Sequence, residues 1–287
     1  MLTNSSVTYY VLRLPIMLST NPEGNYQFIP GTATFSSGAV AQPGYAMVHA
    51  IFRRPLMLAA AFEVMQSHLA GLGRPMQAVA GIELRSPKPF SFASFGGFNK
   101  VYVDLLQQYG LQLTVDGKAL GPAARSNLAP EPLSIAPSEV SVYAFTYTVR
   151  SVAVRGDDGY AQFVAAGSGE LRPAPKSTVN QTVNSGTAPR DLIVRVGETN
   201  GSALREKAIY CMNAVADELS ALGTSWADCT AVNIYTVHPI SGFLHDDILL
   251  PLGDAAIHGV HWHYTRPPIE EIEFEVDARG VSQEIML

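Results

Sequence analysis

The chain has 287 residues and a net charge of -6, and 47% of its residues are hydrophobic while only 15% are charged. Charged residues make up about 25% of a typical globular domain, so this composition predicts a globular protein that buries apolar surface in its core and between subunits. No basic cluster is present to bind phosphate groups, and no apolar run approaches the roughly 18 residues that span a bilayer, which argues against nucleic-acid and membrane partners. We therefore expect a cytoplasmic protein that acts on a small molecule.

The first half of the sequence alternates β-rich segments with two helical patterns. In chain order we expect strands within 25–40 and 45–52, a helix through 62–72, a strand at 79–84, a helix through 95–109, and strands within 121–130 and 142–149. Apolar residues in both helical patterns recur every three or four positions, which places them on one face of each helix.

The second half repeats the centre of this order with a constant offset of 150 residues. The apolar stripe Phe62, Met65, Leu69, Leu72 is matched by Met212, Val215, Leu219, Leu222, and a glycine follows each stripe before a strand-like run. Strands are also expected within 159–171 and 191–198 ahead of this helix. Pro251 must stop or kink the next helical pattern, and strands within 258–264 and 270–276 complete the half.

Each half therefore predicts an α+β domain in which a mixed sheet carries two helices on one face. The polar, proline-containing segment 172–189 is expected to form a mobile loop inside the second half. A polar turn at 155–159 marks the boundary, so the expected domains are residues 1–154 and 155–287.

Short motifs in both halves resemble those of the Rid (RidA/YjgF) family. They are FGGFNKVYVDLL at 95–106, GPAARSNLAP at 121–130, FVAAGSGEL at 163–171 and PPIEEIEFEV at 267–276. The resemblance implies two chorismate-mutase-like (Rid-like) domains in tandem, assembled as a homotrimer with clefts between subunits. It also implies hydrolysis of reactive enamines or imines derived from amino acids, without a metal or cofactor.

The same resemblance assigns roles to individual residues. The family's arginine for the substrate carboxylate corresponds to Arg125, and its water-positioning glutamate corresponds to Glu273. His258 stands at the arginine's position in the second half, so Glu273 and His258 are the expected catalytic residues. Asn99 and Tyr102 are expected to bind substrate from the second helix of the first half. The alternatives are a structural ion pair for Arg125, an exposed strand position for Glu273 and a core position for Tyr102.

These residue types suit the hydrolysis of an imine. Its carbon is already electrophilic, so the reaction needs an anchored substrate, a positioned water and a proton donor for the leaving nitrogen. We therefore expect a hydrolytic deaminase that acts on a small carboxylated enamine or imine, with aminomuconate-like intermediates as one substrate class. A chorismatase-like hydrolase of an enolpyruvyl ether and a non-catalytic small-molecule-binding protein are the alternatives.

Three of the seven histidines lie within six residues, in the segment HGVHWHY. On one continuous strand His261 and His263 would share a face while His258 would lie on the opposite face. This pattern offers two metal ligands and no nearby third, so we expect no metal site and favour buried or interface histidines. Which face lies toward the cleft depends on the strand register, which the sequence leaves open.

Overall fold

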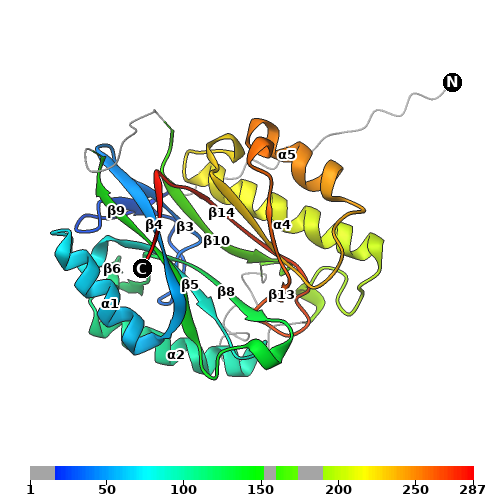
Figure 1. Ribbon diagram of the computed structural model, residues 1–287, viewed down its shortest axis with the longest axis horizontal. Coiled ribbons are helices and arrows are strands. Elements are labelled where there is room, and N and C mark those ends of the chain that lie inside the picture. The colour runs from blue at the N-terminus through cyan, green and yellow to red at the C-terminus, as the bar shows by residue number, and fades with distance from the viewer. Residues whose placement is uncertain (1–16, 152–159, 174–189) are drawn as a thin grey trace.

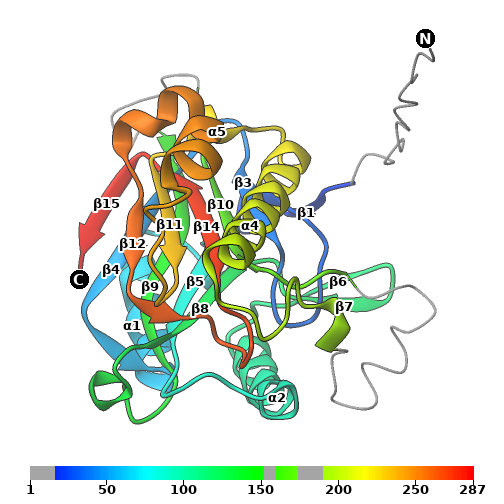
Figure 2. The same ribbon diagram turned by 90° about the vertical axis from the view of Figure 1, so that its right-hand side faces the viewer.

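The computed structural model describes residues 17–151, 160–173 and 190–287. Two large sheets dominate this part of the chain, and a small hairpin of β6 (Leu113–Val115) and β7 (Lys118–Leu120) accompanies them. The inner faces of the large sheets pack against each other, while helices lie on the two outer sides (Figure 1, Figure 2). The architecture is therefore helix, sheet, sheet, helix.

One sheet has seven strands in the order β1-β2-β3-β10-β14-β11-β12, all antiparallel to their neighbours except β11 and β12. The strands are β1 (Ser19–Asn21), β2 (Tyr26–Phe28), β3 (Gly38–Ala41), β10 (Phe163–Gly169), β14 (Glu275–Gly280), β11 (Ala231–Tyr235) and β12 (His261–His263). Val276 and Ala278 on β14 belong to the core beneath α4 (Gly201–Ala221). Glu275, Asp277 and Arg279 alternate with them along β14, so their side chains point to the inner face of the sheet.

The other sheet has six strands in the order β13-β8-β5-β9-β4-β15, with parallel pairing for β5 with β8 and for β4 with β15. The strands are β13 (Thr265–Arg266), β8 (Ala124–Pro130), β5 (Val79–Arg85), β9 (Ser141–Arg150), β4 (Tyr45–Met57) and β15 (Gln283–Met286). Helices α1 (Leu58–Gly71) and α2 (Phe92–Gln108) cover its outer face and share one hydrophobic core with it.

In its described residues, the second half has one long helix where the first half has two. Beyond α4, the segment with Pro251 forms a π-helical turn (Leu244–Leu249), the short α5 (Leu250–Leu252) and a 3-10 turn (Gly253–His258). Further 3-10 turns span Met76–Ala78, Leu133–Ile135, Arg190–Leu192 and Trp226–Asp228. The interruption at Pro251 was predicted, because proline removes a helical hydrogen bond. No helix in the described ranges is both long and apolar enough to cross a membrane.

The internal repeat is visible in the structure. The stripe of α1 buries Phe62, Met65 and Leu69, and the stripe of α4 buries the residues at the corresponding positions. After each helix a glycine adopts a positive φ, +66° at Gly73 and +75° at Gly223, which reverses the chain as expected at a helix end. A 3-10 turn and a strand follow in both halves, β5 in the first and β11 in the second.

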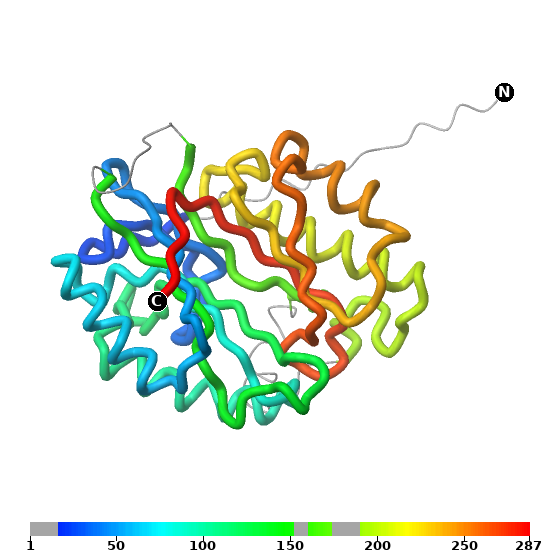
Figure 3. Tube along the Cα trace, viewed as in Figure 1, coloured from blue at the N-terminus to red at the C-terminus, as the bar shows by residue number. Residues whose placement is uncertain are grey.

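The two halves of the sequence contribute strands to each other's sheets. β3 from the first half pairs with β10, and β15 at the C-terminus pairs with β4 (Figure 3). β13 likewise pairs with β8 across the halves. The space between the sheets is therefore lined by residues from both halves of the chain.

An α+β class with mixed sheets and few helices is confirmed, but some local predictions are wrong. The segment 191–198 forms turns and a single bridge at Ile193 instead of a strand. His258 ends a 3-10 turn, and Gly259 with φ +70° separates it from the short strand β12. The predicted boundary at 155–159 and most of the loop at 172–189 lie outside the described residues.

Candidate active site

The inner face of β14 carries charged residues. Glu275, Asp277 and Arg279 alternate with the apolar core positions and are all buried against the six-stranded sheet. Arg279 lies 3.8 Å from the Glu83 carboxylate, and Ser126 donates a hydrogen bond of 2.5 Å to Asp277. Asp277 and Arg279 are thus paired with residues of the opposite sheet, which is the usual condition for burying such groups.

A cavity of about 250 Å³ lies at the Glu275 end of this face. Arg125 and Asn127 reach it from β8, and Glu275 reaches it from β14, so both sheets and both halves of the chain contribute. The remaining lining is mainly apolar and includes the rings of Phe35 and Phe95. A small apolar cavity with a few converging polar groups is the usual form of a small-molecule site.

Arg125 is a buried cation held by aromatic rings. Its guanidinium lies 4.4 Å from the ring centre of Phe35, 5.1 Å from that of Tyr102 and 5.4 Å from that of Phe95. Its Nη1 donates a hydrogen bond of 2.9 Å to Asn99 Oδ1. Burial lowers the pKa of Arg125 to about 10, so the side chain is charged at neutral pH. Within the described residues no carboxylate lies at ion-pair distance from Arg125, which leaves it able to bind an anion.

Glu275 faces the same cavity in a different electrostatic state. Burial raises the pKa of its carboxyl well above the ordinary value, and the neighbouring Asp277 and Glu170 raise it further, whereas Arg125 acts in the opposite direction. Two adjacent acids rarely ionise together in a buried space. The protonated form of Glu275 is therefore favoured relative to that of an exposed glutamate, and in this form the carboxyl can donate a proton.

The local structure of β10 makes room for the Glu275 side chain. The pairing of β10 with β14 shifts between Ala165 and Ser168, which is a β-bulge. A Cβ atom added to Gly167 would overlap the Glu275 carboxylate, so a larger residue at this position would force the Glu275 side chain to move. The AAGSGEL motif thus shapes one wall of the cavity.

A fully buried ion pair fixes the segment ahead of Glu275. Lys207 Nζ on α4 lies 2.9 Å from Glu170 Oε1 and donates a second hydrogen bond of 2.8 Å to Val194 O. The Glu170 carboxylate also accepts hydrogen bonds from the backbone N–H groups of Glu273 and Phe274, at 2.7 and 3.0 Å. These bonds anchor the chain directly before β14 and thereby hold Glu275 in place.

Asn127 has one end of its amide bound and the other end free. Its Oδ1 accepts a hydrogen bond of 2.9 Å from Ser86 Oγ, while Nδ2 is buried and has no hydrogen-bond partner in the described part of the chain. Only 3% of the residue surface is exposed. A buried donor without a partner destabilises a fold by about 1–3 kcal/mol, so its presence at a cavity points to a ligand.

The histidine segment belongs to a second polar cluster, on the far side of Asp277. Asn233 Nδ2 donates to Asp277 at 2.6 Å, and His261 and His263 both lie 3.2 Å from Asn233 Oδ1. Burial lowers the pKa of His263 to about 4. His261 and His263 therefore face the inter-sheet polar residues, opposite to the placement implied by the family register. No set of three or more His, Cys, Asp or Glu side chains within 17–151, 160–173 and 190–287 could hold a metal ion.

The structure brings three of the five predicted site residues together and separates the other two. Arg125 lines the cavity, while Asn99 and Tyr102 support its guanidinium from α2 and do not line the cavity themselves. Glu273 lies outside the cavity lining, where its carboxylate is 2.7 Å from His238 Nε2.

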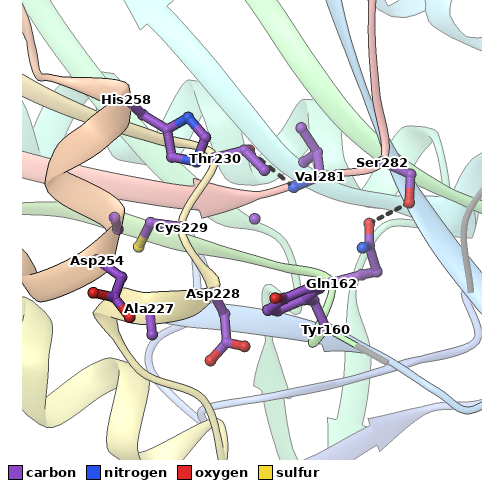
Figure 4. Close-up of a pocket in the computed structure, with 12 residues that line it drawn as sticks. Tyr160, Gln162, Ala227, Asp228, Cys229, Thr230, Asp254, His258, Val281 and Ser282 are labelled. Atoms are coloured by element: carbon purple, nitrogen blue, oxygen red, sulfur yellow. Dashed lines mark hydrogen bonds between the residues drawn. The ribbon is translucent and has the colours of Figure 1, made fainter. Parts of the chain in front are cut away.

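His258 lines a different cavity, of about 390 Å³, together with Asp254 and Thr230 (Figure 4). This second cavity lies where the chain leaves β14 toward β15, since Gly280 and Ser282 also line it. Two hydrogen bonds join residues of its lining to one another. Ser282 Oγ donates to Gln162 Oε1, and the Val281 N–H donates to Thr230 Oγ1. The two predicted catalytic residues thus lie apart from the cavity that contains Arg125.

Sequence reasoning missed Glu275 and Asn127, although both stand inside the quoted motifs. Asn127 follows Arg125 by two residues in PAARSN, so the two share a face of any strand. Glu275 follows Glu273 by two residues in IEFEV. The sequence signal was therefore present, but the position at which the strand begins was needed to choose between the two glutamates.

Residues 18–285 match the family model described as 2-aminomuconate deaminase CnbZ. The chain belongs to this family. A relative, 2-amino-5-chloromuconate deaminase from Comamonas testosteroni, is 36% identical over 265 residues, which cover 92% of this chain and 96% of the relative. A chorismatase crystal structure aligns with a TM-score of 0.42 and 10% identity over 92% of this chain and 79% of that chain. Likeness at that level does not bear on activity.

The family assignment corrects one prediction and confirms another. Membership of the Rid family is wrong, because the CnbZ family is distinct and its model accounts for nearly the whole chain, whereas no Rid family model matches. The resemblance rested on segments of about ten residues that share an arginine strand and an acidic closing strand. The predicted deaminase function is confirmed by the family model and by the relative.

Proposed function

We propose that the protein hydrolyses 2-aminomuconate, or a close analogue of it, to the corresponding 2-oxo acid and ammonia in the cavity between the sheets. The observation that carries this assignment is Arg125, a buried guanidinium at a cavity with no carboxylate partner among the described residues. Family membership and the chloromuconate-acting relative support the substrate class. The substrate supplies the carboxylate that Arg125 lacks.

Glu275 is the proposed proton donor. A 2-amino dienoate is an enamine, and transfer of the Glu275 proton to a carbon of the diene converts it to an iminium ion. Water then adds to the iminium carbon, and the Glu275 carboxylate accepts the proton released, which leaves a neutral carbinolamine. Glu275 returns this proton to nitrogen, the C–N bond breaks to release ammonia, and the carbinol hydroxyl gives its proton to the Glu275 carboxylate as the C=O bond forms. Each turnover thus consumes one water, regenerates the protonated Glu275 and transfers no electrons. The raised pKa of Glu275 favours the protonated form that this step requires.

Arg125 anchors the carboxylate next to the reacting carbon. Its planar guanidinium can donate two parallel hydrogen bonds, which fixes the orientation of the carboxylate. The surrounding rings exclude water, and this strengthens the ion pair. Asn99 holds the guanidinium in its orientation through the hydrogen bond from Nη1.

The remaining sequence predictions belong to this proposal. The repeat of α1, Gly73 and β5 in α4, Gly223 and β11 supports two chorismate-mutase-like units, with 1–154 and 155–287 as their sequence ranges. A homotrimer is proposed from the low charge content, and a cytoplasmic location is proposed from the shortness of the apolar runs in the sequence. The substrate is a small carboxylated molecule, and no cofactor is required because the imine carbon is itself electrophilic.

Ammonia release tests the proposed function. 2-Aminomuconate is generated in the assay by enzymatic oxidation of its semialdehyde, and ammonia is measured with glutamate dehydrogenase. The wild-type protein is expected to accelerate release well above the spontaneous rate, and Glu275→Gln is expected to reduce it. Release at the spontaneous rate with the wild-type protein would refute the deaminase and support the non-catalytic binding protein.

A further inference from the structure

Asn127 has features that the proposed mechanism does not use. Ser86 Oγ fixes the orientation of the amide by donating to Oδ1, and Ser86 is itself fully buried and bound through its backbone N–H to Leu128 O. The Nδ2 group therefore remains as the free end of the amide at a cavity that Asn127 lines. The two N–H donors of this neutral amide can bind an acceptor such as a carboxylate oxygen.

We infer that Asn127 binds the distal carboxylate of the substrate, the one remote from the amino group, and so makes the site selective for dicarboxylates. The inference rests on the proposed function for the identity of the substrate. Arg125 and Asn127 lie two residues apart on β8, so their side chains project from the same face of the strand, and both line the cavity. A substrate whose first carboxylate is bound by Arg125 can therefore present its second carboxylate to Asn127.

Among the described side chains that line the cavity, Asn127 is the remaining neutral donor. Leu171, Ile269 and Ile272 are apolar, and Glu275 is the proposed proton donor. A second carboxylate placed among these groups without a donor would be strongly destabilised. A neutral amide supplies donors without adding another buried positive charge close to Arg125.

Binding of two non-reactive diene acids tests the inference. Muconate and sorbate share a six-carbon diene chain and differ in the distal carboxylate, which sorbate lacks. Calorimetry on the wild-type protein is expected to give at least about tenfold tighter binding of muconate, since a hydrogen bond to a charged group is worth that much or more. Asn127→Asp keeps the acceptor for Ser86 but places a negative charge at the free end, so it is expected to abolish the preference while sorbate still binds.

Gln107→Glu is the matched control, because it adds the same charge on the exposed end of α2. It should retain the wild-type preference. Equal affinity of the wild-type protein for the two acids, or an unchanged preference in Asn127→Asp, would overturn the inference. An Asn127→Asp variant that loses affinity for both acids equally would instead assign Asn127 a structural role, also against the inference. Because these measurements need no turnover, they remain decisive even if the ammonia assay refutes the deaminase.

Discussion

Replacement of Arg125 by methionine separates a substrate-binding arginine from a structural one. Burial lowers the pKa of Arg125 to about 10, and at about 1.4 kcal/mol per pKa unit this means that the folded state disfavours the charge by about 3 kcal/mol. Contacts with the rings of Phe35, Phe95 and Tyr102 offset this, at about 0.5–2 kcal/mol each. Because the opposing contributions are of similar size, Arg125→Met is expected to change the free energy of unfolding by less than the roughly 3–5 kcal/mol lost when a buried ion pair is broken.

The same substitution is expected to be severe for catalysis. Loss of the carboxylate contact inside a desolvated cavity should weaken transition-state stabilisation by about 2–5 kcal/mol. This corresponds to a decrease in kcat/KM of roughly 30-fold to several thousand-fold. Arg125→Lys should restore part of the loss, since it retains the charge without the two-point grip. Steady-state kinetics and thermal denaturation on the same preparations provide the measurement.

A destabilised Arg125→Met protein would contradict this reasoning. Removing one partner of a buried ion pair typically lowers the free energy of unfolding by about 3–5 kcal/mol. A loss of that size in Arg125→Met would therefore indicate a structural role for Arg125. A stable variant with normal kcat/KM would also refute the assignment and direct attention to the cavity at His258.

Four further results are expected. Glu275→Gln should lower kcat by about 10²–10⁴-fold, and Glu273→Gln should lower it less. If Glu273→Gln instead lowered kcat more, Glu273 would be the catalytic residue. The kcat of the wild-type protein should also decline as pH rises through the raised pKa of Glu275. Because folding raises the pKa of Glu275, its contribution to stability is complete below the ordinary glutamate pKa of about 4.3 and is lost as pH rises from there through the raised pKa, so Glu275→Gln should flatten the decline of Tm over that range. Lys207→Met should reduce the free energy of unfolding by about 3–5 kcal/mol, because it leaves Glu170 buried without a partner, and adding Glu170→Gln should recover part of the loss in urea denaturation. Light scattering should report a trimer at micromolar concentration, and a monomer would contradict the assembly.

The parts of the site that depend on local sequence were predictable. Asn99 and Tyr102 lie three residues apart on one helix, which places both near a single point, and the strand that contains Arg125 packs beneath that helix. The repeat of helix, glycine and strand was equally readable, because its apolar spacing is local.

The acid was not predictable because long-range contacts determine where β14 begins. Glu170 and Lys207, far from Glu273 in sequence, hold the backbone of Glu273 and Phe274 outside the strand. The bulge in β10 then makes space for Glu275. Similarly, Gly259 ends the turn at His258 and sets a register for His261 that periodicity alone left open.

Pairing of β15 with β4 has a consequence for biogenesis. β4 is one of the earliest elements to leave the ribosome, whereas β15 follows every other described element in the sequence. Until β15 arrives, one edge of β4 presents free backbone groups that can pair with a strand from another nascent chain. The order of synthesis thus delays both the closing of this edge and the delivery of Glu275 to Arg125, and it makes aggregation during translation a hazard specific to this topology.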